Sequence, residues 1–205
     1  MIGRPSPDPM DNIAIFWWAF SIRGGFAVLF AGLLAFSGNL LGSLFFDPVM
    51  LVLLSLLLGF YVFANAVLLG VGAAFAVKHR LALGWMLAAE SCFALLLGAY
   101  ISFSLLMTSQ SIALLAGLHA VGTGCFQACL ALKLHLYKRF KLLLSISALI
   151  AISVGALFLT HQAEPPRLIA LWMSGFELIY GVIVVAFARA LYLQGQTLAN
   201  SSHQS

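Results

Sequence analysis

Residues 15–36 read IFWWAFSIRGGFAVLFAGLLAF, an apolar stretch that contains a single charge, Arg23. About 20 helical residues cross the ~30 Å hydrocarbon layer of a bilayer, so this stretch is long enough to span it. Five further apolar stretches follow it, and all are continuous rather than alternating, which favours helices over barrel strands. The sequence therefore predicts an all-α integral membrane protein with six transmembrane helices, at residues 14–36, 49–77, 82–106, 111–133, 141–160 and 167–192.

The composition indicates the same class. Of the 205 residues, 63% are hydrophobic and 8% are charged, whereas a soluble domain is about 45–50% apolar and about 25% charged. Lipid must then be the solvent for most of the surface. We expect one transmembrane domain at 14–192 between two short polar cytoplasmic tails, at 1–13 and 193–205.

The formal net charge of +4 does not indicate nucleic-acid binding, because of where the charges lie. Basic residues follow the second stretch, at 78–80, and join the fourth to the fifth, at 133–141. Asp47, Glu164 and Arg167 lie in loops at the other side. This is the positive-inside pattern. It predicts a multi-pass protein of a bacterial inner membrane, with both termini in the cytoplasm and the lipid bilayer as its surroundings.

The six stretches form three repeats of two helices each, at about 14–80, 81–139 and 140–192. When the first stretch is superposed on the third, Trp18 meets Trp85 and Arg23 meets Glu90. In the looser alignment of the fifth stretch, Ser147 falls at the same position. Each repeat crosses the membrane twice, so all three repeats point the same way and are parallel rather than inverted.

The second, fourth and sixth stretches align with one another as well, so that Asn65, Thr123 and Tyr180 coincide. They also carry small residues at four-residue spacing, which lets helix backbones approach closely in lipid. We expect these three stretches to form the inner packing, with pseudo-threefold symmetry. The small residues predicted to pack are Ala66, Gly70, Ala116, Ala120, Gly124 and Ala128.

Apart from charges at or near the ends of the spans, three charged residues and one histidine fall well inside them: Arg23, Glu90, His119 and Glu177. At 1.5 Å of rise per residue, all four lie near the middle of the membrane. A charge there costs about 2.5–3.5 kcal/mol on insertion scales, so each needs a partner or a role. One interpretation is a structural ion pair of Arg23 with Glu90, and pairing with Glu177 is the alternative. Another is a proton-responsive site in which Glu177 or His119 changes charge.

The chain offers little for cofactors, metals or catalysis. Cys92, Cys125 and Cys129 give no disulfide framework and no CxxC metal site, and we interpret them as small packing residues. His119, the one histidine in the middle of a span, is a weak candidate for tetrapyrrole ligation. His79 and His135, at the cytoplasmic ends of the second and fourth stretches, are a second candidate as a pair of haem ligands. No hydrolase or phosphate-binding motif is present, so we expect no cofactor and no enzymatic activity.

Four segments together resemble the HdeD-like acid-resistance membrane protein family. They are FWWAFSIRGGFAVLFAGLLAF at 16–36, LGFYVFANAVLLGVGAAF at 58–75, GWMLAAESCFALLLGAY at 84–100 and AGLHAVGTGCFQA at 116–128. The Arg23-Gly24 step and Glu90 match that family, whereas Asn65 stands where it often has an acidic residue. The resemblance implies an inner-membrane protein linked to acid stress, and it gives no catalytic residues.

Three functional hypotheses follow from these observations. The first is a non-enzymatic, stress-associated and proton-sensitive membrane protein. The second is a transporter of protons or a small solute, which requires a water-accessible path to Arg23, Glu90 or Glu177. The third is an accessory subunit of a larger membrane complex, one that could contain a pigment or haem. As protein partners we consider either such a complex or further copies of this chain in a homo-oligomer.

Overall fold

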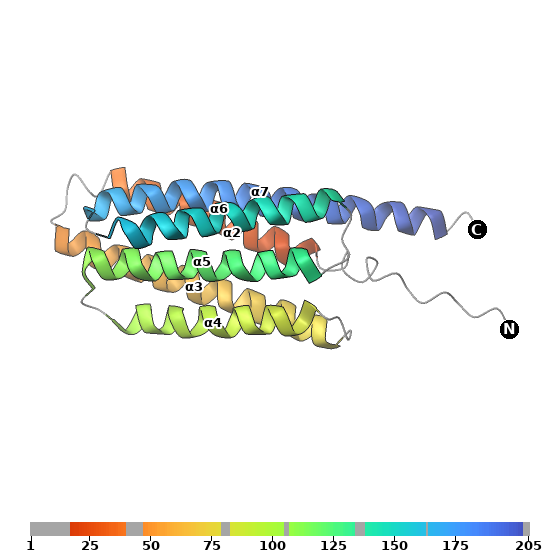
Figure 1. Cartoon of the computed structure of the whole chain (residues 1–205), viewed down its shortest axis with the longest axis horizontal. Coiled ribbons are helices and arrows are strands. Elements are labelled where there is room, and N and C mark those ends of the chain that lie inside the picture. Colours follow the sequence, from red (N-terminus) through yellow and green to blue (C-terminus); the bar gives the residue numbers. More distant parts are fainter. Residues whose placement is uncertain are drawn as a thin grey trace.

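The computed structural model describes residues 17–39, 47–78, 83–104, 107–133, 138–162 and 164–202. Within these ranges the chain forms six antiparallel helices (Figure 1). Each contains a segment long and apolar enough to cross a membrane, which confirms the predicted fold class. The helices are α2 (Trp17–Asn39), α3 (Asp47–Lys78), α4 (Leu83–Phe103), α5 (Ser109–Lys133), α6 (Lys138–Thr160) and α7 (Pro166–Ser202).

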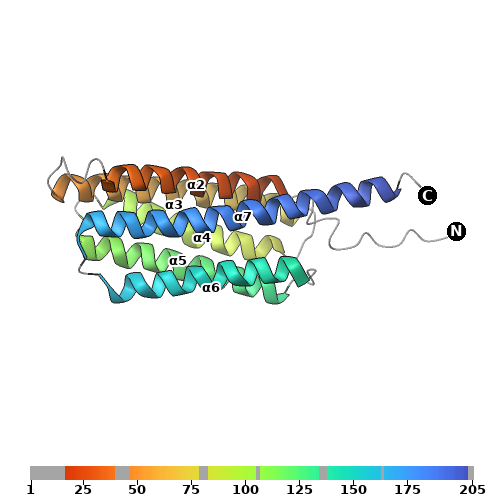
Figure 2. The ribbon, with the colours of Figure 1, turned by 90° about the horizontal axis from the view of Figure 1, so that it is seen from above.

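The last helix is longer than the sequence predicts. We expected it to end near residue 192 and to be followed by a polar tail, but α7 continues to Ser202 and projects beyond the bundle (Figures 1 and 2). Within this extension, Gln196 Nε2 donates to the hydroxyl of Tyr192 one turn earlier, at 2.7 Å. The fall in hydrophobicity near residue 192 therefore marks where the apolar segment ends. A helix that has already formed adds polar residues at little cost.

The most extensive helix contacts join neighbouring repeats rather than the two helices of one repeat. They form between α3 and α4, between α5 and α6, and between α7 and α2, so that the last repeat closes back on the first. We call these three contacts the seams. The even-numbered predicted spans, now α3, α5 and α7, contact one another at the centre and are buried over more of their length than the odd ones. This is the arrangement expected from the small residues in those spans.

Each seam is built on small residues, because the two backbones nearly touch. A Cβ atom added to Gly24 would lie 2.9 Å from the carbonyl oxygen of Gly181, and one added to Gly155 would lie 2.8 Å from that of Gly117. The small residues recur every seven positions, as in supercoiled helix pairs. These residues are Gly24 and Ala31, Ser91 and Gly98, Ala148 and Gly155, Gly59 and Ala66, Gly117 and Gly124, and Ser174 and Gly181.

The heptad spacing alters the role of the four-residue ladders. Gly124 lies in its seam, against the carbonyl oxygen of Ala148. Ala116 and Ala120 are buried in the shared core instead, and Ala128 is only half-buried. In a supercoiled pair the helix returns to its partner every seven residues, so a strict four-residue ladder turns away from the seam. In the seam between α3 and α4, Ala66 and Gly70 of α3 both lie against Ser91 of α4.

The three cysteines were predicted to be small packing residues, and this was wrong. Cys92, Cys125 and Cys129 all lie on exposed faces of α4 and α5. Lipid and protein interior are both apolar, so the sequence of a transmembrane helix separates its two faces poorly. Large apolar side chains such as Leu96 and Phe103 also lie on this outer surface.

Two ends of the bundle differ in charge. We call the end at which α2 begins the basic end, because α3 finishes there with Lys78 and α6 carries the exposed Lys141 in its first turn. The opposite end holds the start of α3 at Asp47, the bend that carries Glu164, and the exposed Arg167 in the first turn of α7. Of the predicted basic residues, His79, Arg80 and His135 lie outside the part of the chain that the structure describes.

Candidate functional site

A buried ion pair joins the first two repeats. Arg23 Nη2 of α2 donates to Glu90 Oε1 of α4 at 2.8 Å, and both side chains are 6% exposed. Of the two pairings that the sequence allows for Arg23, the structure forms this one. The guanidinium also lies over the ring of Tyr180, with Cζ 5.6 Å from the ring centroid. Arg23 is therefore held by a carboxylate on one side and an aromatic face on another.

Glu177 has a different kind of partner. The hydroxyl of Tyr61 in α3 donates to Glu177 Oε2 at 2.5 Å, and the two residues are 2% and 4% exposed. The Tyr61 ring is fixed by stacking on Phe30, at 4.0 Å between centroids, and it meets the edge of the His119 ring at 6.4 Å. A neutral phenol thus makes the hydrogen bond to this carboxyl group, whereas Glu90 has a cation.

A third buried connection runs through α5 and involves no charge. Ser147 of α6 donates to Gln127 Oε1, and Gln127 Nε2 donates to the hydroxyl of Tyr180, both at 2.8 Å. All three residues are at most 5% exposed. Because Tyr180 also lies under Arg23, this connection links the neutral groups of the third repeat to the ion pair of the first two.

Several of these side chains occupy equivalent positions in the three repeats but differ in identity. Arg23 and Glu90 share their position with Ser147, and Tyr61 shares its position with His119. We call the set that meets at the centre the polar group, and its members come from all six helices. They are Arg23, Tyr61, Glu90, His119, Gln127, Ser147, Glu177 and Tyr180.

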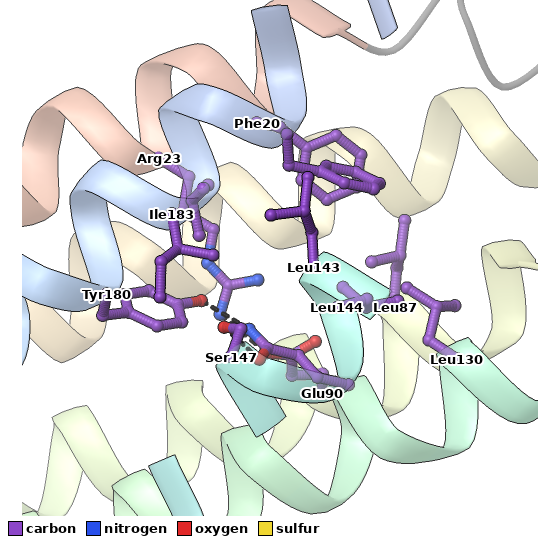
Figure 3. A pocket seen from close by; sticks show the side chains of 13 residues that line it. Phe20, Arg23, Leu87, Glu90, Leu130, Leu143, Leu144, Ser147, Tyr180 and Ile183 are labelled. Carbon is purple, nitrogen blue, oxygen red and sulfur yellow. Dashed lines mark hydrogen bonds and ion pairs between the residues drawn. The ribbon is translucent and has the colours of Figure 1, made fainter. Parts of the chain in front are cut away.

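Three cavities adjoin the polar group. Two of them are lined by several of its residues, and the third touches Arg23 alone of the group, beside Leu68 and Leu69. The central cavity lies among α3, α5 and α7, is lined by Arg23, His119, Thr123 and Glu177, and has room for about one water molecule. The second, which we call the vestibule, lies toward the basic end (Figure 3). Its floor consists of polar side chains and its walls are apolar. The floor residues are Arg23, Glu90, Gln127, Ser147 and Tyr180, and the wall includes Phe20, Leu87, Leu130, Leu144 and Phe187.

The four residues predicted to form an intramembrane cluster are thus all part of one site. Arg23 binds Glu90, and His119 and Glu177 line the central cavity together with Arg23. Sequence reasoning did not assign Tyr61, Gln127, Ser147 or Tyr180 to the site, although the repeat alignment had placed Ser147 with Arg23 and Tyr180 with Thr123. A signal for Tyr61 was present, because it aligns with His119 in the repeats. Gln127 lies one turn beyond Thr123 on α5, and only three-dimensional packing connects it to Ser147 and Tyr180.

The arrangement brings titratable side chains together and leaves little room among them for a large cofactor. The central cavity beside His119 is far smaller than a tetrapyrrole. No group of three metal-ligating side chains forms among the residues that the structure describes. The site does hold two carboxyl groups, two phenols and an imidazole around one guanidinium.

In comparisons with known proteins, no protein-family model, curated protein or solved structure matches this chain.

Proposed function

We propose that this chain is a non-enzymatic, proton-responsive protein of a bacterial inner membrane, acting in acid stress as the HdeD-like proteins that its sequence resembles are expected to. Both termini and the basic end lie on the cytoplasmic side in this proposal, in keeping with the positive-inside pattern. Glu177 is the responding group, and Arg23, Tyr61, His119 and Tyr180 are the charged or titratable side chains that face it.

The observation that carries the proposal is the charge balance of the buried site. It contains two carboxyl groups, Glu90 and Glu177, but one permanent cation, Arg23, which is already paired with Glu90. Glu177 is bonded to a phenol that cannot balance a negative charge. The charge of the site therefore changes by one unit when Glu177 gains or loses a proton.

Such a change reaches the rest of the bundle through Arg23. The guanidinium lines the same cavity as Glu177 while it binds Glu90 on α4 and lies over Tyr180 on α7. A negative charge on Glu177 attracts Arg23 away from Glu90, and protonation of Glu177 releases it. Because Gly24, next to Arg23, lies in the seam between α2 and α7, movement of Arg23 is coupled to packing of those helices.

A protein that responds to protons fits the apolar packing better than a transporter does. Between the polar group and the end opposite the basic one, the described helices fill the axis with large buried side chains. These are Leu54, Leu58, Ile112, Ile169 and Met173. A transported ion or solute would need a path through this region.

The proposal is tested with Glu177→Gln, which keeps the shape of the side chain but holds it uncharged. Wild-type protein in lipid nanodiscs should change its tryptophan fluorescence and helix crosslinking between neutral and mildly acidic pH. Glu177→Gln should resemble the acid form at neutral pH and lose the response. Glu164→Gln, a half-buried glutamate at the opposite end, serves as the matched control and should respond as wild type does.

Two outcomes would contradict the proposal. One is an unchanged pH response in Glu177→Gln, which would remove Glu177 as the responding group. The other concerns a bacterial strain that lacks a counterpart of this protein. If cells of that strain survive an acid challenge equally well with and without the protein expressed in them, the proposed role is contradicted. The first outcome concerns the site, and the second concerns the physiological role.

A further inference from the structure

Two buried polar atoms in the described part of the chain have no hydrogen-bond partner, and their side chains line the same cavity. They are Nε of Arg23 and Nδ1 of His119. Each residue is 6% exposed. Leaving a buried polar atom unpaired costs about 1–3 kcal/mol, and more for a charged group, so two such atoms at one cavity indicate a shared ligand.

The chemistry of the lining fits a water molecule. The N–H at Arg23 Nε can donate to a water oxygen, and the water can donate its two hydrogens to His119 Nδ1 and to a carboxyl or hydroxyl oxygen. Glu177 and Thr123 supply such oxygens on the lining of the cavity. About three hydrogen bonds is the usual number for a buried water, and the cavity has room for about one.

The central cavity and the vestibule meet at two shared residues. Arg23 and Tyr180 line both, so the wall between the two spaces is formed by the guanidinium and the phenol ring. On its other side the vestibule passes Phe20, Leu87 and Leu144, which lie one helical turn nearer the basic end than the polar floor (Figure 3). Among the described residues, the cavities that adjoin the polar group thus lie at its centre and on the side of the basic end.

We infer that the central cavity is a water site that bridges Arg23 and His119, and that protons reach Glu177 through this water and the vestibule from the basic end alone. This inference rests on the proposed function, because it names the side of the membrane whose pH Glu177 follows. The bound water relays the proton to the Glu177 carboxylate, and the charge of the site rises by one unit. The proton is taken from the aqueous phase at the basic end, and it returns there when Glu177 ionises.

The test is a one-sided acid jump on protein reconstituted in liposomes. The three exposed cysteines are replaced by alanine, and Lys78→Cys is labelled with an impermeant maleimide to measure the fraction of molecules with the basic end outward. External acid is then mixed in while the interior is buffered. The amplitude of the fast fluorescence response should equal the labelled fraction. An amplitude equal to the unlabelled fraction, or to the whole population, would overturn the inference.

Filling the cavity tests the water itself. Ala120→Val places two methyl groups in the cavity lining, and Thr123→Val removes a hydroxyl without changing volume. In both variants the response should be lost or slowed by an order of magnitude. Ala113→Val, an equally buried alanine of α5 that does not line the cavity, should respond as wild type does. A wild-type rate in folded Ala120→Val and Thr123→Val would overturn the water site.

These results separate the inference from the proposed function. A response that depends on Glu177 but comes from the wrong side, or that survives filling of the cavity, contradicts only the inference. A response that persists in Glu177→Gln contradicts the proposed function. No response of wild-type protein from either side contradicts both.

Discussion

The seams and the axis of this bundle use the repeated sequence in opposite ways. Each seam carries small residues at the same two positions, whichever repeats it joins, so the same close approach of backbones is made three times. At the axis, one set of equivalent positions holds an arginine, a glutamate and a serine. Equivalent residues that face the axis of a pseudo-threefold bundle lie close to one another. Three identical charges would repel there, so a charge is neutralised only if the repeats carry different residues at that position. The seams therefore define the fold, and the differences between repeats create the site.

The largest effect is expected from breaking the axis at its ion pair. Arg23→Leu and Glu90→Leu should each destabilise the protein, because removal of one partner from a buried pair typically costs about 3–5 kcal/mol. Arg23→Leu should cost more, since in Glu90→Leu the guanidinium still lines a cavity with Glu177. The double variant should recover much of the loss. Unfolding in mild detergent by a denaturant series measures this, and purely additive losses would show that the two residues do not stabilise each other.

A smaller effect is expected from breaking one seam. Gly24 and Gly25 are neighbours on α2, but a Cβ atom at Gly24 meets the backbone of α7 whereas one at Gly25 meets nothing within 4 Å. Gly24→Ala should destabilise the protein by about 1–3 kcal/mol through overpacking. Gly25→Ala should be neutral or stabilising by up to about 1 kcal/mol, because alanine favours helix. Equal thermal stability of the two variants would argue against the seam geometry.

The smallest effect is expected on the lipid-facing surface. Cys92, Cys125 and Cys129 take part in neither seam nor axis, so their joint replacement by alanine should change stability by no more than about 0.5 kcal/mol. Thermal unfolding of the triple variant and of wild type in the same detergent measures this. A loss of stability well above about 1 kcal/mol would place the cysteines in the packed interior, as the sequence had suggested.

Much of this fold follows from the sequence because lipid imposes simple rules. Continuous apolar stretches long enough to cross the membrane predicted the six helices, and the aligned repeats predicted which three lie inside. The partners in the seams were not predictable in the same way. Contacts between repeats and contacts within a repeat use identical small residues, and only the packed structure shows that α7 closes onto α2.

The candidate site was predictable where a residue was costly in lipid. Arg23, Glu90, His119 and Glu177 stand out in apolar stretches because each needs a partner. Tyr61 and Gln127 do not stand out, since a phenol or an amide is tolerated more readily in a membrane helix. The length of α7 was also missed, because loss of hydrophobicity signals the membrane surface rather than the end of a helix.

The central claim is that Glu177 is the group of the buried site that takes up a proton. Infrared difference spectroscopy, acid minus neutral, on protein in lipid tests it most directly, because protonated carboxyl groups absorb at a C=O stretch separate from that of carboxylates. Wild-type protein and Glu164→Gln should both show a band gained in acid that shifts in heavy water, and Glu177→Gln should lack it. The same band at full intensity in Glu177→Gln would contradict the account.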